Sequence, residues 1–317
     1  KVGDQSIMLH LEVKKSTVEI EDGYLAEFCE KIGMRHFFGF GHLWQSMGLR
    51  LFVPIPNCFP VSLSQDDLDF MWGEGAFFIH HAVPDNENGF PGYVFLIDDK
   101  SYDLDCIRSS DRRHNIRRAF KYCTVDQVSF ELLKSEAPRL ISDTYLRQCR
   151  NCGASVLEGW KTYMDAAGSN PLFSAWGTFV GKELAAAKIE FRYRGGVHPE
   201  ALFSRTDLLK YYTMNALLFV STRETIRKDD VTYISHGMRP VTGEKESLAG
   251  FKESMGFRKL TVNERLEVNP VIKRFLGRYC CKASSWIPER FCENSEYVRL
   301  VQGILSTLDR QAECCGT

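Results

Sequence analysis

The sequence predicts an α/β protein, and three observations support this prediction. The second half of the chain has the pattern strand, strand, strand, helix, strand, helix, strand. The composition, 44% hydrophobic and 26% charged over 317 residues, is that of an ordinary globular protein. The sequence contains no run of about 18 apolar residues, so no membrane-spanning helix is expected.

The first half mixes strands and helices. Ser64 is expected to cap a short helix over residues 64–72, because acidic residues follow it directly. The loop over residues 85–92 is indicated by its Asn, Gly and Pro content. A basic helix is expected over residues 110–122, and a strand and a helix follow it, ending near Cys152. The remaining strands of this half are expected at residues 51–55, 76–80 and 93–97.

The second half has the clearer pattern. A short helix over residues 248–255 should end at Gly256, which fits the left-handed position after a helix. Its expected buried face comprises Leu248, Phe251 and Met255. A long helix is expected from about residue 207 to 227, with a buried face formed by Leu209, Tyr212, Ala216, Phe219 and Ile226. The strands are expected at residues 173–180, 184–193, 201–204, 231–235 and 260–268.

Two helical segments are expected after Pro270. The last one carries an apolar stripe, formed by Tyr297, Leu300, Val301, Ile304, Leu305 and Leu308. Such a stripe indicates either docking on the body of the protein or a contact between two copies of the chain.

Charge and cysteine content restrict the class of protein. Forty basic and 41 acidic residues give a net charge of -1, so no global basic field favours nucleic acid. The eleven cysteines are scattered through a large chain, which favours a reduced, cytoplasmic protein. The Cys149 and Cys152 pair lacks a second pair at zinc-finger spacing, so no metal is expected.

Several segments together resemble GNAT acyltransferases, and in particular their Fem-type branch. The basic run at residues 112–121 looks like the arginine-rich helix of Fem-type enzymes. Residues 209–218 look like the start of the long helix in their catalytic lobe. The strand end Ser235-His236-Gly237, followed by Phe251-Lys252, is similar to their closing pattern. These motifs span the region from the basic helix to the closing strand.

The resemblance implies a fold and an activity. The expected fold has tandem GNAT-like lobes, with mixed central sheets flanked by helices and a helical tail. The expected divisions are an N-terminal lobe at 1–150, a catalytic lobe at 151–269 and a tail at 270–317. The implied reaction moves an acyl or aminoacyl group from acyl-CoA, an acyl carrier or aminoacyl-tRNA to a small-molecule or peptide amine. No tightly bound cofactor is expected.

One segment departs from common GNAT enzymes. These enzymes bind the pyrophosphate of acyl-CoA with a glycine-rich turn before the long helix. Residues 203–208 hold no glycine, so close approach of the backbone to a pyrophosphate is harder. This argues against acyl-CoA and favours the Fem-like branch, with a tRNA donor possible in that branch and Arg205 as an alternative source of positive charge.

Four residues are the catalytic candidates. Lys252 would offset negative charge on the oxyanion or a phosphate, and His236, at the end of a strand, would accept a proton. Glu190 would act as a base, as a carboxylate on the corresponding strand does in several GNAT enzymes. Tyr211 would meet the substrate. Ordinary packing, hydrogen bonding or solvation is the alternative for each of them.

The basic helix is expected to present one charged row. Arg113, Arg117 and Lys121 lie four residues apart and stack on one face, opposite a buried side marked by Ile116 and Phe120. The row is predicted to bind phosphates of the donor, or to be a solvated basic face. A non-catalytic module that binds a phosphorylated ligand or nucleic acid is the alternative to the enzyme.

Overall fold

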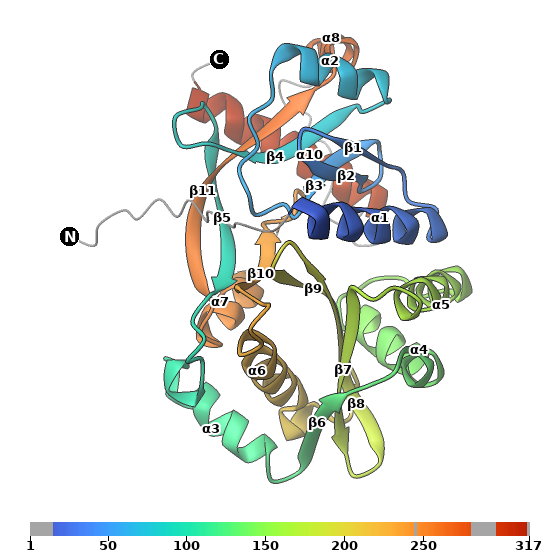
Figure 1. Ribbon diagram of the computed structural model, residues 1–317, viewed down its shortest axis with the longest axis vertical. Coiled ribbons are helices and arrows are strands. Elements are labelled where there is room, and N and C mark those ends of the chain that lie inside the picture. Colours follow the sequence, from blue (N-terminus) through green and yellow to red (C-terminus); the bar gives the residue numbers. More distant parts are fainter. Residues whose placement is uncertain (1–14, 244–245, 280–295, 316–317) are drawn as a thin grey trace, which may run out of the picture.

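The computed structural model describes residues 15–243, 246–279 and 296–315, and eleven strands in them form one continuous sheet (Figure 1). Their order across the sheet is β1-β2-β3-β4-β11-β5-β10-β9-β8-β7-β6. The strands are β1 (His36–Gly39), β2 (His42–Ser46), β3 (Leu51–Ile55), β4 (Phe78–Val83), β5 (Phe90–Ile97), β6 (Cys123–Gln127), β7 (Phe173–Val180), β8 (Glu183–Tyr193), β9 (Gly196–Ser204), β10 (Tyr233–Met238) and β11 (Arg258–Val268).

Helices cover this sheet on both faces, as expected for an α/β protein. Ser64 caps α2 in a reciprocal capping box with Asp67, as its sequence context predicted. The helices are α1 (Lys15–Lys31), α2 (Gln65–Gly73), α3 (Ser110–Ala119), α4 (Phe130–Arg147), α5 (Ala154–Gly168), α6 (Thr213–Ile226), α7 (Glu246–Ser254), α8 (Pro270–Tyr279) and α10 (Glu296–Cys315), with short 3-10 turns η1 (Leu104–Cys106) and η2 (Leu209–Tyr211).

The prediction of separate central sheets was wrong, because one sheet runs through both halves. β5 pairs antiparallel with β11 on one side and with β10 on the other, so the hydrogen bonding continues from one half to the other. Each half nevertheless repeats one pattern, in which an antiparallel run ends in a parallel pair. These parallel pairs are β3 with β4 and β9 with β10.

The chain crosses between the two halves of the sheet more than once. β11, late in the sequence, pairs with β4 and β5, which come early. β6, which precedes residue 150, pairs with β7 of the second half. The division of the chain at residues 150 and 269 stays a prediction.

Helices cover both faces of β7, β8 and β9 (Figure 1). Ala187 and Ile189 of β8 are buried on one face, where the core also includes residues of α4 and α5. Lys188 and Glu190 point to the other face, because side chains alternate along a strand, and α6 lies over that face. Glu190 is therefore buried rather than exposed to solvent.

Leu209, Phe120 and Leu248 were predicted to be buried but are exposed, Leu209 to 38%, and Tyr212 is only partly buried. Tyr212 has a left-handed backbone with φ 56°, so α6 begins only at Thr213 and the predicted helix start at residue 207 was wrong. Phe120 is 45% exposed because α3 buries its Ile116 and Ala119 face instead. Leu248 is also 45% exposed, since Ala249 takes its place against the core.

The C-terminal helix docks on the body of the protein. Leu300, Ile304 and Leu305 of α10 are buried, which confirms the docking prediction for this stripe. The side chain of Tyr297 lies outside the described part of the chain. No helix among the described residues is both long and apolar enough to cross a bilayer.

Candidate functional site

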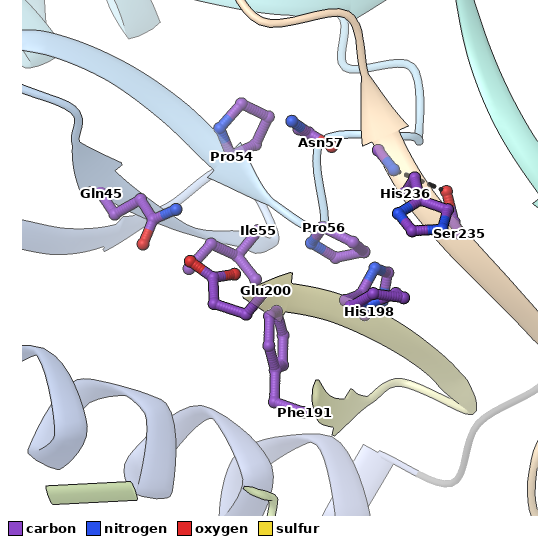
Figure 2. A pocket seen from close by; sticks show the side chains of 12 residues that line it. Gln45, Pro54, Ile55, Pro56, Asn57, Phe191, His198, Glu200, Ser235 and His236 are labelled. Atoms are coloured by element: carbon purple, nitrogen blue, oxygen red, sulfur yellow. Dashed lines mark hydrogen bonds between the residues drawn. The ribbon is translucent and has the colours of Figure 1, made fainter. Parts of the chain in front are cut away.

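A cavity opens where two parallel strands separate. β9 and β10 pair only between Gly196–Val197 and Tyr233–Ile234, and then diverge. Residues 54–57, at the end of β3, close one side of the space between them (Figure 2). The cavity has a volume of about 100 Å³ and is lined by Gln45, Pro54, Ile55, Pro56, Asn57, Phe191, His198, Pro199, Glu200, Ser235, His236 and Gly237.

Irregularities in both diverging strands occur at this cavity. In β9, Ala201 and Pro199 pair with consecutive residues of β8, so Glu200 is an extra residue in a β-bulge. In β10, two residues, His236 and Gly237, stand opposite one residue of β5. Bulges re-aim side chains and are common next to active sites. Here they bring a carboxylate and an imidazole to one cavity (Figure 2).

Gly237 allows the end of β10 to lie close to the loop that contains Asn57. Its φ is 69°, and a Cβ atom built there would lie 2.3 Å from Asn57 Oδ1. That same oxygen accepts a hydrogen bond from the Met238 backbone N–H at 3.1 Å. A residue without a side chain is therefore needed for this wall of the cavity to close.

Gly237→Ala is expected to destabilise the protein by about 1–2 kcal/mol, because the left-handed backbone disfavours a Cβ atom and the contact with Asn57 is lost. Thermal unfolding measures the effect. Gly159→Ala is the matched control, since nothing lies within 4 Å of its added Cβ and the site is helical. The control is expected to stabilise slightly, and equal melting temperatures for the two variants would contradict the prediction.

His236 has the environment of a neutral imidazole. Its Nε2 atom is buried and has no hydrogen-bond partner among the described residues. Its ring lies 4.7 Å from the Phe257 ring. Burial, and next the positive charges of Lys252 and Lys188, hold the pKa of His236 well below its usual range. The imidazole is therefore unprotonated at neutral pH and can accept a hydrogen bond.

Lys252 is not among the residues that line the cavity. Its ammonium group sits 5.0 Å from the centre of the Phe95 ring, and Phe95 is the β5 residue opposite His236 and Gly237. The positive charge of Lys252 is one of the causes that lower the pKa of His236. A shared catalytic role for these two residues stays a prediction.

Glu190 and Tyr211 lie elsewhere. Glu190 is 2% exposed and pairs with the equally buried Lys188 at 2.5 Å. Its Oε1 accepts hydrogen bonds from Trp176 at 2.9 Å and Thr225 at 3.2 Å. Because these contacts bury the carboxylate of Glu190 beneath α6, Glu190 is poorly placed to act as a base on a substrate. Tyr211 lies beside Tyr122 near the end of α3, with ring centroids 5.3 Å apart.

The predicted phosphate-binding residues are also dispersed. Arg113 donates to the carbonyl oxygens of Ile107 and Arg108. Arg205 pairs with Glu183 and Asp207, which offset its charge. Arg117 on α3 remains exposed, and so does Lys121, which lies after the helix because α3 ends at Ala119 rather than at residue 122.

Two titratable lining residues, Glu200 and His198, were not predicted from the sequence. Glu200 keeps contact with solvent, yet the protein packed around its carboxyl group raises its pKa. His198 is buried, stacks at 5.0 Å on Phe191 and has its pKa lowered to about 4 by burial. The sequence feature that could have indicated this site is Pro199, because a proline inside a strand marks an edge strand or a bulge.

The other reactive groups near the cavity indicate neither a metal site nor a thiol nucleophile. Among the described residues, no three His, Cys, Asp or Glu side chains are grouped so that they could hold a metal ion. Burial raises the pKa of Cys58, next to the lining residue Asn57, to about 11. Its thiol is therefore protonated and a poor nucleophile at neutral pH.

The fold is that of GNAT proteins in the Fem-like form. FemX superposes with a TM-score of 0.60 at 11% identity, covering 83% of this chain and 98% of FemX. L-PGS from Bacillus licheniformis superposes with a TM-score of 0.54 at 13% identity, covering 82% of this chain and 96% of L-PGS. The C-terminal domain of a putative lysylphosphatidylglycerol synthetase from Agrobacterium fabrum gives 0.54 at 12% identity, covering 82% of this chain and 95% of that domain. No family model and no curated protein matches the sequence.

Proposed function

We propose that this chain is an N-acyltransferase that joins an acyl or aminoacyl group to an amine in the cavity between β9 and β10. One observation carries the proposal: bulges in both strands bring Glu200 and His236 to the same cavity. The similarity of fold to FemX and L-PGS supports the same class of reaction.

The proposed mechanism uses Glu200, His236 and Lys252 once each. The amine attacks the carbonyl carbon of the activated acyl group as a neutral nucleophile, and its nitrogen becomes positively charged and acidic as the C–N bond forms. Glu200 takes the proton from that nitrogen, because the raised pKa of its carboxylate makes it a stronger base than an ordinary glutamate. The bond to the carrier then breaks, and the carrier leaves with the electron pair.

His236 and Lys252 serve orientation and charge. The neutral imidazole of His236 lines the same cavity as Glu200, so its ring is suited to orient the attacking amine. The ammonium group of Lys252 offsets negative charge that develops on the carbonyl oxygen or on a phosphate of the carrier. Direct transfer is favoured over a covalent enzyme intermediate, since the Cys58 thiol beside the cavity stays protonated.

The donor is proposed to be acyl-CoA, an acyl carrier or aminoacyl-tRNA. The junction between β9 and α6 holds no glycine, and Arg205 in it is already paired. These two features favour a donor other than acyl-CoA. They also favour the second candidate function, a GNAT-like module that binds a phosphorylated ligand without catalysis.

The experiment that separates the two functions measures binding and consumption with the same ligands. A panel of acyl-CoAs, CoA and aminoacyl-tRNA mimics is screened by thermal shift, first alone and then with primary amines. Formation of an amide by mass spectrometry supports the enzyme. Tight binding of a donor that remains intact with every amine supports the binding module.

Lys252→Ala and His236→Ala are each expected to lower kcat by on the order of 10-fold, less than the loss of a direct oxyanion donor. Both variants should retain the fold, because neither side chain contributes to the main hydrophobic clusters. Steady-state kinetics on the amide-forming reaction measures the effect. Lys161→Ala, an exposed lysine on α5, is the control. Wild-type kcat in the Lys252→Ala variant would remove that residue from the site.

A further inference from the structure

An exposed corner of the molecule combines positive charge with apolar side chains. This corner, which we call the α3 corner, consists of the last turn of α3, the residues after it and η2. Figure 1 shows the end of α3 at the periphery of the molecule, beside β6. Its residues are Arg117, Arg118, Phe120, Lys121, Tyr122, Leu209, Lys210 and Tyr211.

The apolar side chains of the α3 corner are unusually exposed for their size. Tyr122 is 50% exposed, Phe120 45% and Leu209 38%. Tyr122 and Phe120 rest on Tyr211 and Phe219, with ring centroids 5.3 and 6.0 Å apart. Each contact covers one side of the Tyr122 or Phe120 ring. The other side of each ring faces outward and forms an exposed apolar edge.

The positive charges around this edge are not neutralised within the protein. Arg117 and Lys121 have no acidic partner among the described residues, and both are exposed. Lys210 lies over the Tyr211 ring at 5.2 Å, and Arg118 over the Tyr212 ring at 5.3 Å, so aromatic faces rather than carboxylates support these cations. The result is a cluster of four cations around exposed rings, although the whole chain has a net charge of -1.

We propose that the α3 corner docks on an anionic lipid surface. Basic side chains are attracted to acidic headgroups, and aromatic rings with a polar tip enter the boundary between headgroups and acyl chains. A site for the phosphates of a soluble carrier would need the cations but not the protruding Phe120 and Leu209. A single-stranded nucleic acid would stack on open ring faces, whereas Tyr211 covers part of Tyr122 and Leu209 offers no ring.

Docking at the α3 corner leaves the cavity accessible. The cavity is lined by residues of β2, β3, β8, β9 and β10 and the loop after β3, and no residue of the α3 corner is among them. The surface is thus separate from the proposed acyl-transfer site. The proposal also stands independently of the proposed function, since it concerns attachment and not chemistry.

Co-sedimentation with vesicles tests the proposal on the full chain. We expect the protein to bind vesicles of phosphatidylcholine that contain about one third phosphatidylglycerol, and not to bind vesicles of phosphatidylcholine alone. Binding should weaken as the salt concentration is raised, because dissolved ions screen the attraction between the basic side chains and the acidic headgroups. The double variant Arg117→Glu and Lys121→Glu is expected to bind at least about 25-fold more weakly, at about fivefold for each charge lost.

Matched controls separate the α3 corner from general surface charge. Lys161→Glu with Arg274→Glu changes two exposed cations elsewhere and should bind like the wild type. Tyr122→Ser should weaken binding severalfold, whereas Leu146→Ser, at a 76% exposed leucine on α4, should not. Circular dichroism and thermal melting establish that each variant is folded.

Three results would overturn the proposal. The first is equal binding to neutral and acidic vesicles, and the second is unchanged binding after charge reversal at Arg117 and Lys121. The third is binding to single-stranded RNA that the same reversal abolishes, in the absence of vesicle binding. That third result would assign the surface to nucleic acid instead.

Discussion

Glu200→Gln is expected to lower kcat by about 10²- to 10⁴-fold, the usual contribution of a positioned general base. The amide keeps the size and polarity of the side chain but cannot take a proton from the attacking amine. Because Glu200 is the extra residue of a bulge and retains solvent contact, the substitution should leave the fold and the melting temperature nearly unchanged. The loss should therefore appear in kcat, with little change in KM.

The pH dependence gives this prediction a second readout. The pKa of Glu200 is raised, so the carboxylate form is lost on acidification at a higher pH than for an ordinary glutamate. The rate of the wild type should fall on the acid side as pH drops through that raised pKa, and the Gln variant should lack this limb. Glu158→Gln, on the exposed face of α5, is the control. An unchanged acid limb in Glu200→Gln would show that another group is the base.

Lys188→Met is expected to destabilise the protein by about 3–5 kcal/mol, because it leaves the carboxylate of Glu190 buried and uncompensated. The pair is 0% and 2% exposed at 2.5 Å, with α6 above it and strands on either side. Denaturant titration measures the shift in unfolding. Lys188 has no contact with the substrate in the proposed mechanism, so activity per folded molecule should change much less than stability.

The double variant Lys188→Met with Glu190→Leu tests the cause. Removing both charges should recover much of the lost stability, although Trp176 and Thr225 then lose an acceptor. Arg192→Met breaks an exposed pair with Asp230 and should cost less than about 1 kcal/mol. If the single Lys188→Met variant were as stable as Arg192→Met, the buried pair would not contribute as argued.

The fold could be predicted from the sequence where local patterns decide it. The strand at 51–55 agrees residue for residue with β3, and the capped helix over 64–72 agrees within a residue with α2, since a short apolar run and a helix cap are local signals. The alternation of β8 correctly placed Lys188 and Glu190 on one face. It could not show that α6 covers that face, because burial depends on a helix more than twenty residues later in the chain.

The candidate site was less accessible to sequence reasoning, for a physical reason. His236 was predicted from a motif at the end of a strand, and it lines the cavity, whereas Lys252 is not among the lining residues. Glu200 was missed because its exposure to the cavity depends on a bulge, which breaks the alternation that sequence patterns measure. The loop over residues 54–57 was missed because it reaches the cavity only through the order of strands in the sheet.

The late position of β11 has a practical consequence for fragments. If the chain were truncated after residue 150, β4 and β5 would both lose the strand that lies between them. Each would present a row of unsatisfied backbone groups, which invites aggregation. The remaining fragment, from residue 151 onward, would lack Asn57 and the rest of the loop that walls the cavity. Neither piece could be purified as a working half, and only co-expression of both would be expected to restore the pocket.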